Sequence, residues 1–473
     1  MDAFRFAKES QGKGFSVEHH TAKVLEKSEK LNKRFHHLKL ISSDYAVKRS
    51  KELDRQGKRS GRLFGLPVSV KDCLCIKGIE STAGSKILSG YLPVSTATAV
   101  KKLEEEGAVV IAKTAQDEFG FGTFSTNILE QKIPLNPFDL ERSCGGSSGG
   151  SAGFTAVADF PHVSVGESTG GSIACPASFC GVVGLTPSYG RVSRHGLIDY
   201  ANSLDKIGAI AKTVREAALL LELMSGKDEK DSTSLPAEAE KLSELNGTDA
   251  KKLRVGVVKE FFGAGISSGV SKVAWNAIKQ LESEGARVEE VSLPLNAKFG
   301  IAAYYLIALS EASTNLARYC GMRYGVHEKL EGNFDEYFSM VRSKNFSKES
   351  KRRIILGTFA RMAGFRGAYY VRAMKARTKL VEEFRKAFKS FTVLAHPTMP
   401  LVAPKFSEIE KLSPLQQYSM DLCTVPANLA GLPHISVNAG KSSGMPVGLM
   451  FSADHLHEKN VVSAAAALEA VVA

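Results

Sequence analysis

Apolar residues follow the helical and the strand period in turn along this chain. Between residues 16 and 56 they recur at helical spacing among polar residues, which predicts two surface helices. Residues 64–70 and 109–112 form short strand-like runs, and the second run follows a helical pattern that ends at Gly107. Helices that alternate with apolar strands predict an α/β fold.

The second half of the chain continues this alternation. The strand-like run 253–258 precedes a helical pattern over 270–284 and a second strand-like run at 286–288, which together predict a βαβ unit. A basic helix with an apolar stripe is predicted at about residues 371–388, and a buried strand at 392–395 leads into a proline-rich turn. The sequence shows no internal repeat and no low-complexity tract.

The length of 473 residues exceeds one ordinary hydrophobic core, because cores stop growing near roughly 250 to 300 residues. The chain therefore has either several domains or one large sheet-based domain. Its 43% hydrophobic and 24% charged residues are typical of a globular protein. No run approaches the roughly 18 apolar residues of a membrane span, and the first residues lack a signal-peptide pattern. We expect a cytoplasmic enzyme without a membrane partner.

The formal net charge of +12 is unevenly distributed, since residues 342–389 carry 15 basic and 3 acidic side chains. Such a surplus attracts polyanions, but exposed helices also carry Lys and Arg for solubility. No nucleic-acid-binding motif accompanies the surplus. The seven cysteines include no CxxC pair, so the sequence predicts neither a disulfide framework nor a zinc site, and we expect no metal bound by this chain.

Two glycine-serine segments are the strongest candidates for chemistry. Residues 143–153 read SCGGSSGGSAG and residues 166–172 read GESTGGS. Their side chains are too small to build a core, which predicts that both segments are loops. A phosphate-binding loop is one interpretation, but the Lys-Ser/Thr of a P-loop and the dinucleotide-binding spacing are both missing. A nucleophile elbow is a second one, because Ser147 and Ser148 each satisfy G-x-S-x-G. That pattern arises easily in so glycine-rich a stretch.

A third interpretation is a serine nucleophile activated by a lysine. A serine hydroxyl needs a base, and a lysine can be that base when burial leaves its amine neutral. Lys71 meets this need, because it stands at the end of a strand-like run.

Four ordered segments resemble the amidase signature family and favour this third interpretation. They are residues 65–72 (GLPVSVKD), 145–152 (GGSSGGSA), 166–172 and 181–187 (GVVGLTP). The resemblance extends from about residue 64 to about residue 451. It implies one large α/β/α domain in which helices cover a central mixed β-sheet. We accordingly divide the chain into an N-terminal helical segment packed on the core, residues 1–62, and an amidase-signature domain, residues 63–473.

The resemblance implies a Ser-cisSer-Lys triad. Ser172 would be the nucleophile that forms an acyl-enzyme, Ser147 the bridging serine on a cis peptide, and Lys71 the general base. The backbone N–H groups beside the nucleophile would form the oxyanion hole, and a further serine would support them; these residues are Thr169, Gly170, Gly171 and Ser148.

The downstream half resembles the glutaminase (A) subunits of tRNA-dependent amidotransferases, in segments 304–319, 351–359 and 418–433. This implies hydrolysis of glutamine and use of its ammonia to amidate Glu-tRNA(Gln), or in some relatives Asp-tRNA(Asn). Free glutamine presents an α-carboxylate and an α-ammonium, so its pocket needs a guanidinium and a carboxylate.

By position in these segments, Arg353 would bind the carboxylate, Asp421 the ammonium, and Tyr305 would line the pocket. Several positions depart from the family pattern. Beside the nucleophile, Ser168 stands where an aspartate is usual, with Glu167 next to it, and Ala174 stands where a basic residue is usual. Cys73 and Cys320 replace the usual Asn and Asp of two other motifs, and one extra residue separates the two serine segments.

The resemblance also implies partners. A B subunit would bind tRNA(Gln) and use ATP and Mg²⁺, a small C subunit would complete a heterotrimer, and this chain would bind no cofactor itself. Two alternatives stay open: a free-standing amidase that hydrolyses another small amide, and a non-catalytic scaffold for tRNA.

Overall fold

A computed structural model describes residues 1–12, 14–56, 59–129, 131–236, 240–245 and 250–472. In these residues, eleven strands form one mixed sheet in the order β1-β3-β2-β4-β6-β5-β10-β11-β9-β7-β8. The strands are β1 Leu38–Ile41, β2 Pro67–Lys71, β3 Val109–Thr114, β4 Val163–Ser168, β5 Val183–Thr186, β6 Lys206–Ala211, β7 Arg254–Val258, β8 Arg287–Val291, β9 Val393–Pro397, β10 His434–Ser442 and β11 Met445–Ser452.

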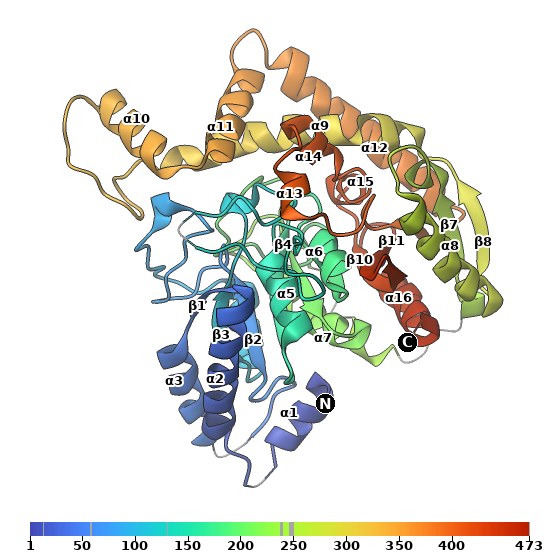
Figure 1. The fold of residues 1–473 in the computed structure, drawn as a ribbon, viewed down its shortest axis with the longest axis horizontal. Coiled ribbons are helices and arrows are strands. Elements are labelled where there is room, and N and C mark those ends of the chain that lie inside the picture. The colour runs from blue at the N-terminus through green and yellow to red at the C-terminus, as the bar shows by residue number, and fades with distance from the viewer. Residues whose placement is uncertain (13, 57–58, 130, 237–239, 246–249, 473) are drawn as a thin grey trace.

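Helices surround this sheet (Figure 1). They are α1 Ala3–Ser10, α2 Val17–Phe35, α3 Ser43–Asp54, α4 Thr98–Glu105, α5 Gly149–Val157, α6 Ala174–Cys180, α7 Val214–Met224, α8 Ser268–Ser283, α9 Pro294–Asn315, α10 Phe334–Asn345, α11 Lys348–Arg361, α12 Arg372–Phe388, α13 Phe406–Ile409, α14 Pro414–Ser419, α15 Val425–Leu429 and α16 Glu458–Val472. The predicted mixed α/β fold is confirmed.

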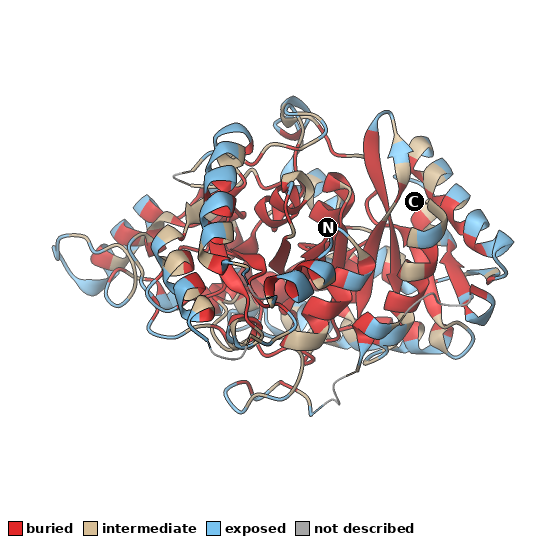
Figure 2. Cartoon of the chain, turned by 90° about the horizontal axis from the view of Figure 1, so that it is seen from below, coloured by how far each residue is buried: buried red, intermediate tan, exposed pale blue. Residues whose placement is uncertain are grey.

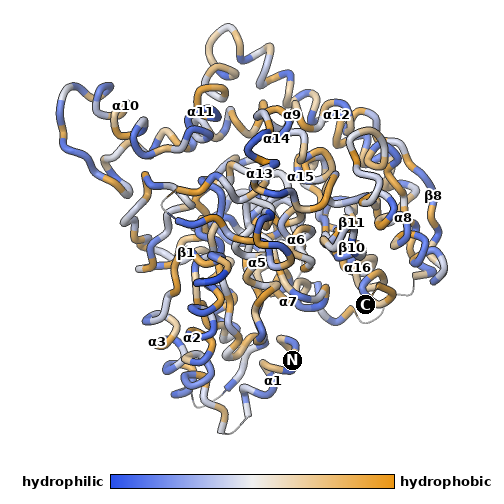
Figure 3. The backbone as a smooth tube through the Cα atoms, in the orientation of Figure 1, coloured by the Kyte–Doolittle hydropathy of each residue, from blue (hydrophilic) through white to orange (hydrophobic). Residues whose placement is uncertain are grey.

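Two series of helices in mutual contact pack against the sheet. One series is α3, α2, α5 and α6, and the other is α4, α7, α16 and α8. A third group, α9, α11 and α12, runs along the top of the molecule in Figure 1. Most strands are buried, except the edge strands β1 and β8, whereas the helices turn exposed faces outward (Figure 2). Hydrophilic and hydrophobic residues alternate along the outer helices (Figure 3). In the described residues, no helix is long and apolar enough to cross a membrane.

Strand β2, the third strand from one edge of the sheet, is buried at all five residues and pairs in parallel with both β3 and β4. A parallel strand covered on both faces is expected to be almost entirely apolar, and β2 departs from this only at Ser69 and Lys71. The predicted βαβ unit is also confirmed, because β7 and β8 are parallel neighbours joined through α8.

The structure corrects the interpretation of residues 143–153 as a loop, because α5 begins at Gly149. A Cβ on Gly150 would lie 2.3 Å from the backbone oxygen of His37, and one on Gly153 would lie 2.4 Å from the His37 imidazole. These glycines therefore allow a helix to pack closely against the segment that leads into β1. Close packing accounts for Gly150 and Gly153, whereas Gly145 has a positive φ of 76° that favours glycine.

The predicted helical segment, residues 1–62, also contains a short strand. β1 pairs antiparallel with β3 at the edge of the sheet. A run of four residues is too short to give a clear strand pattern, which is why the sequence did not indicate it. The domain boundary between residues 62 and 63 stays a prediction.

Candidate active site

Strand β2 ends at Lys71, whose side chain lies in the interior of the protein. The side chain is 0% exposed. Its Nζ donates to Ser147 Oγ at 2.8 Å, to the backbone oxygen of Glu167 at 2.9 Å and to Glu167 Oε2 at 2.9 Å. The neighbouring strand β4 supplies Glu167, so the parallel pairing of β2 and β4 sets this contact. Lys71 is thus in hydrogen-bond contact with the predicted bridging serine.

The two glycine-serine segments meet in front of Lys71. The peptide bond between Gly146 and Ser147 is cis, and Ser147 is fully buried. Ser172 lies between β4 and α6, and its backbone oxygen accepts a hydrogen bond from the N–H of Ser148 at 3.2 Å. Of these serines, Ser172 lines a small pocket at the protein surface, and 6% of it is exposed. The arrangement gives Ser172 access to a substrate and leaves Lys71 shielded from water.

The residues before Ser172 have no space for larger side chains. A Cβ on Gly171 would lie 2.3 Å from Thr424 Oγ1, and one on Gly170 would lie 2.7 Å from the hydroxyl of Tyr304. The backbone N–H groups of residues that lack a side chain can approach a developing oxyanion closely. The packing therefore agrees with the predicted oxyanion hole, whose third member is Thr169.

Replacement of Gly171 by alanine is expected to lower kcat for amide hydrolysis by about 10²- to 10³-fold, the effect of one lost oxyanion donor. The new methyl group would force the turn away from Thr424 and displace its amides. Steady-state ammonia release measures the effect. Gly367→Ala is the matched control, because a Cβ at Gly367 meets nothing within 4 Å; equal activity of the two variants would contradict the assignment.

Arg353 enters the same pocket from α11 and is surrounded by aromatic rings. Its Cζ lies 5.0 Å from the ring centre of Phe121, 5.5 Å from Tyr305 and 5.3 Å from Tyr418. Its Nη1 donates to the hydroxyl of Tyr200 at 2.8 Å. Rings packed on a guanidinium fix its plane and stabilise its charge. The guanidinium is therefore held in place before a substrate arrives.

Asp421 lines the same pocket and is held by two hydroxyl groups. Tyr305 donates to Asp421 Oδ2 at 2.7 Å, and Thr123 donates to Asp421 Oδ1 at 3.0 Å. Ser172, Tyr305, Arg353 and Asp421 all line the pocket. The structure thus brings the predicted nucleophile and the predicted substrate-binding residues together around one space.

Burial sets the charge states of the acidic groups in this region. Burial raises the pKa of Asp421, and the hydrogen bonds from Tyr305 and Thr123 partly offset this. Burial also raises the pKa of Asp117, which lies beside Gly146, to about 6. Burial alone would lower the pKa of the Arg353 guanidinium. Electrostatic interactions with groups that include Tyr200 and Glu349 have the larger effect, so this pKa is raised.

Several residues of the site were not predicted from the sequence. Glu349 accepts from Arg353 Nε at 2.8 Å, and its position four residues earlier on one helix was a usable signal. Asn428 donates to the backbone oxygen of Thr169, and nothing in the sequence indicated this contact. Ser148, predicted as a supporting residue, donates its hydroxyl to the backbone oxygen of Glu167 at 3.1 Å.

Comparison with known proteins assigns the chain to a family. A sequence model of the amidase family matches residues 19–462. The chain belongs to the amidase family. The amidase signature resemblance of the sequence segments is thereby confirmed.

Individual members of the amidase family align over most of this chain. It is 47% identical over 428 residues to the A subunit of the glutamyl-tRNA(Gln) amidotransferase of Methanococcoides burtonii. That alignment covers 90% of this chain and 89% of the relative. The chain is 46% identical over 424 residues to the protein of the same name from Staphylococcus aureus, covering 89% and 87%. The crystal structure of the corresponding Thermotoga maritima protein matches with a TM-score of 0.78 at 36% identity, covering 96% of this chain and 91% of that one.

Two of the departures from the amidase-family pattern, Ser168 and Ala174, lie close in sequence to the predicted nucleophile Ser172. Ser168 Oγ is 3.4 Å from Asn428 Oδ1, and the preceding Glu167 contacts Lys71 through its carboxylate. Ala174 is fully buried at the start of α6 and packs with Ala427. The carboxylate of Glu167 thus lies one position before the aspartate of the family pattern, and it contacts Lys71, the predicted base.

Proposed function

We propose that this chain is the glutamine-hydrolysing A subunit of a glutamyl-tRNA(Gln) amidotransferase. The observation that carries the proposal is the pocket in which Arg353 and Asp421 flank the approach to Ser172. A guanidinium and a carboxylate that line one pocket match the α-carboxylate and α-ammonium of free glutamine. The names of the relatives that align over most of the chain support the same assignment.

Acylation begins at Ser172. In the reacting form Lys71 is a neutral amine, which keeps its two hydrogens on the Glu167 oxygens and turns its lone pair to Ser147 Oγ. It accepts a proton from Ser147, which in turn accepts the proton of Ser172, and the freed oxygen attacks the γ-amide carbon of glutamine. The backbone N–H groups of Thr169, Gly170 and Gly171 stabilise the oxyanion. The proton then returns through Ser147 to the leaving nitrogen, ammonia departs, and a glutamyl ester remains on Ser172.

Water then hydrolyses the glutamyl ester by the same steps in reverse. Lys71 takes a proton from water through Ser147, hydroxide attacks the ester, and Ser172 regains its proton as glutamate forms. The ammonia is passed to a partner B subunit, which activates Glu-tRNA(Gln) with ATP and Mg²⁺, and a small C subunit completes the complex. The basic surplus of residues 342–389 suits an assembly that handles tRNA.

Truncated substrates test this proposal against a free-standing amidase. We expect the assembled amidotransferase to release ammonia from glutamine at least about 10²-fold faster, in kcat/KM, than from 4-aminobutanamide, which lacks the α-carboxylate, or glutaramate, which lacks the α-ammonium. ATP and Glu-tRNA(Gln) should be present. Equal turnover of the three amides would favour the free-standing amidase.

The pH dependence of glutamine binding should report Asp421. Its carboxylate binds the α-ammonium only when ionised, and burial raises its pKa. As the pH falls through that raised pKa, the carboxylate is protonated and the KM for glutamine rises; above it, KM is constant.

The Asp421→Asn variant is the control for this measurement, because its side chain does not titrate. Its KM should be high and should not change with pH over the same range. Asp117 titrates in both proteins, so its contribution cancels in the comparison. A parallel rise of KM in wild type and variant would show that another group is responsible.

A further inference from the structure

The hydroxyl of Thr169 lies between two buried carboxyl groups. Its Oγ1 is 2.9 Å from Glu167 Oε1 and 2.8 Å from Asp205 Oδ1. A hydroxyl group has one hydrogen and can donate to only one of these oxygens. The other carboxyl must therefore donate to the hydroxyl, which requires that it is protonated. The geometry thus places one shared proton on the Glu167 and Asp205 pair.

Asp205 is the better of the two sites for this proton. Burial, and then the neighbouring Glu167, raise the pKa of Asp205 well above its usual range. The backbone N–H groups of Tyr200 and Ala201 donate to its carboxyl group and hold it in place.

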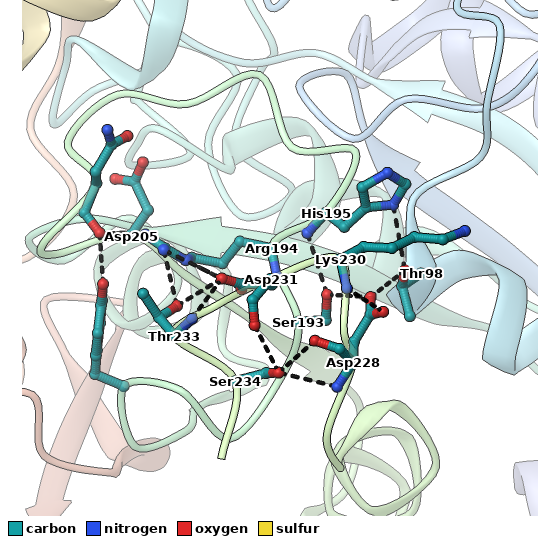
Figure 4. Close-up of polar contacts among 12 residues, drawn as sticks. Thr98, Ser193, Arg194, His195, Asp205, Asp228, Lys230, Asp231, Thr233 and Ser234 are labelled. Atoms are coloured by element: carbon teal, nitrogen blue, oxygen red, sulfur yellow. Dashed lines mark hydrogen bonds and ion pairs between the residues drawn. The ribbon is translucent and has the colours of Figure 1, made fainter.

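The pair connects the catalytic lysine with a second pocket. Glu167 contacts Lys71 Nζ through its other oxygen, Oε2, at 2.9 Å. At the opposite end, Asp205 lines a surface pocket of about 250 Å³. That pocket shares no described lining residue with the pocket at Ser172. Figure 4 shows Asp205 beside the polar network of Arg194 and Asp231. The other charged or titratable residues that line it are His195, Asp199 and Lys230.

The proposed reaction leaves a proton in the active site at every turnover. Glutamine and water give glutamate with an ionised γ-carboxylate, neutral ammonia and one proton. The serine proton leaves with ammonia, and water supplies the proton that restores Ser172. The remaining proton comes from the newly formed γ-carboxyl group, and Lys71 is the nearest base. Lys71 must lose this proton before it can act again.

We propose that Glu167, Thr169 and Asp205 form a proton relay that carries this proton from Lys71 to the second pocket. The inference rests on the proposed function, in which ammonia leaves as the neutral molecule. Asp205 first releases its own proton to water in the pocket. The Lys71 ammonium gives a proton to Glu167. The Thr169 hydroxyl then accepts the proton from Glu167 and passes its own to the ionised Asp205. Each group ends the cycle in its starting state. These three residues act through Lys71 and are positioning residues.

Thr169→Val in the assembled amidotransferase, with ATP and Glu-tRNA(Gln), tests the relay. Valine has nearly the shape of threonine, keeps the backbone N–H and lacks the hydroxyl. We expect kcat for ammonia release to fall about 10-fold or more, because proton removal becomes rate-limiting, while kcat/KM for glutamine changes less than about 2-fold and KM therefore falls together with kcat. The burst of ammonia in the first turnover should stay at the wild-type rate. The solvent deuterium isotope effect on kcat should rise.

Matched variants separate the relay from a structural effect. Thr169→Ser keeps the hydroxyl and should restore kcat. Asp205→Asn should reproduce the loss, which covers the case in which Thr169→Val does not fold. Thr186→Val is the neutral control, because the hydroxyl of this fully buried threonine has no hydrogen-bond partner in the described part of the chain.

Three outcomes would overturn the inference. An unchanged kcat and isotope effect in Thr169→Val would show that the proton leaves through the substrate pocket. An equal loss in the burst and in the steady state would show that the hydroxyl only shapes the oxyanion hole. If wild type releases no ammonia from glutamine, the proposed function fails and the relay fails with it, whereas an active wild type with a normal variant overturns the relay alone.

Discussion

Ser172→Ala is expected to reduce glutamine-dependent ammonia release by at least about 10⁴-fold, because an active site without its nucleophile retains only binding and oxyanion stabilisation. Glutamine binding should persist, since Arg353 and Asp421 are untouched. The measurement is ammonia release by the assembled amidotransferase, together with equilibrium binding of glutamine. Lys71→Met should be impaired to a similar degree, because members of one catalytic unit are not additive.

Ser452→Ala provides the control for the nucleophile. Ser452 is a fully buried serine on β11 whose hydroxyl has no hydrogen-bond partner in the described structure. Its replacement removes the same atoms without touching the triad, so activity should stay close to wild type. Substantial turnover by Ser172→Ala, within about 10-fold of wild type, would mean that a different residue carries the acyl group.

Arg353→Met should lower kcat/KM for glutamine by about 10²- to 10³-fold, as expected when one partner of a desolvated ion pair is removed. Methionine keeps much of the volume inside the aromatic cage and removes the charge. Turnover of 4-aminobutanamide, which has no α-carboxylate, should change little. Steady-state kinetics with glutamine and with 4-aminobutanamide gives kcat/KM for each amide directly.

Arg352→Met is the matched control for this second prediction. Arg352 pairs with the same Glu349 but is not among the residues that line the pocket. We expect its kinetics with glutamine to remain near wild type. If the two arginine variants lose glutamine turnover equally, the guanidinium of Arg353 acts through Glu349 and helix α11 and does not bind the carboxylate.

The sequence predicted the parts of the site that lie in short contiguous motifs. The apolar run before Lys71 indicated a buried strand, and β2 ends at that lysine. The glycines around Ser147 and Ser172 indicated close backbone approach, and the structure shows it at Gly171. These features were accessible because a single segment carries both the pattern and the chemistry.

Contacts between distant segments were not accessible in this way. Asp205 meets Thr169 across 36 positions of the chain, and Asn428 meets it across 259. Neither residue stands in a pattern that specifies a partner. The helical start of α5 was not predicted for a related reason. Its glycines are required because they pack closely against His37, a residue more than a hundred positions earlier.

Detection of the acyl-enzyme tests the central claim most directly. The assembled amidotransferase would be quenched in acid during turnover of glutamine, digested, and examined by mass spectrometry. We expect a glutamyl ester on the peptide that contains Ser172, absent from Ser172→Ala and from Lys71→Met. An ester on Ser147 or Ser148, or ammonia release with no ester on any serine, would contradict the account.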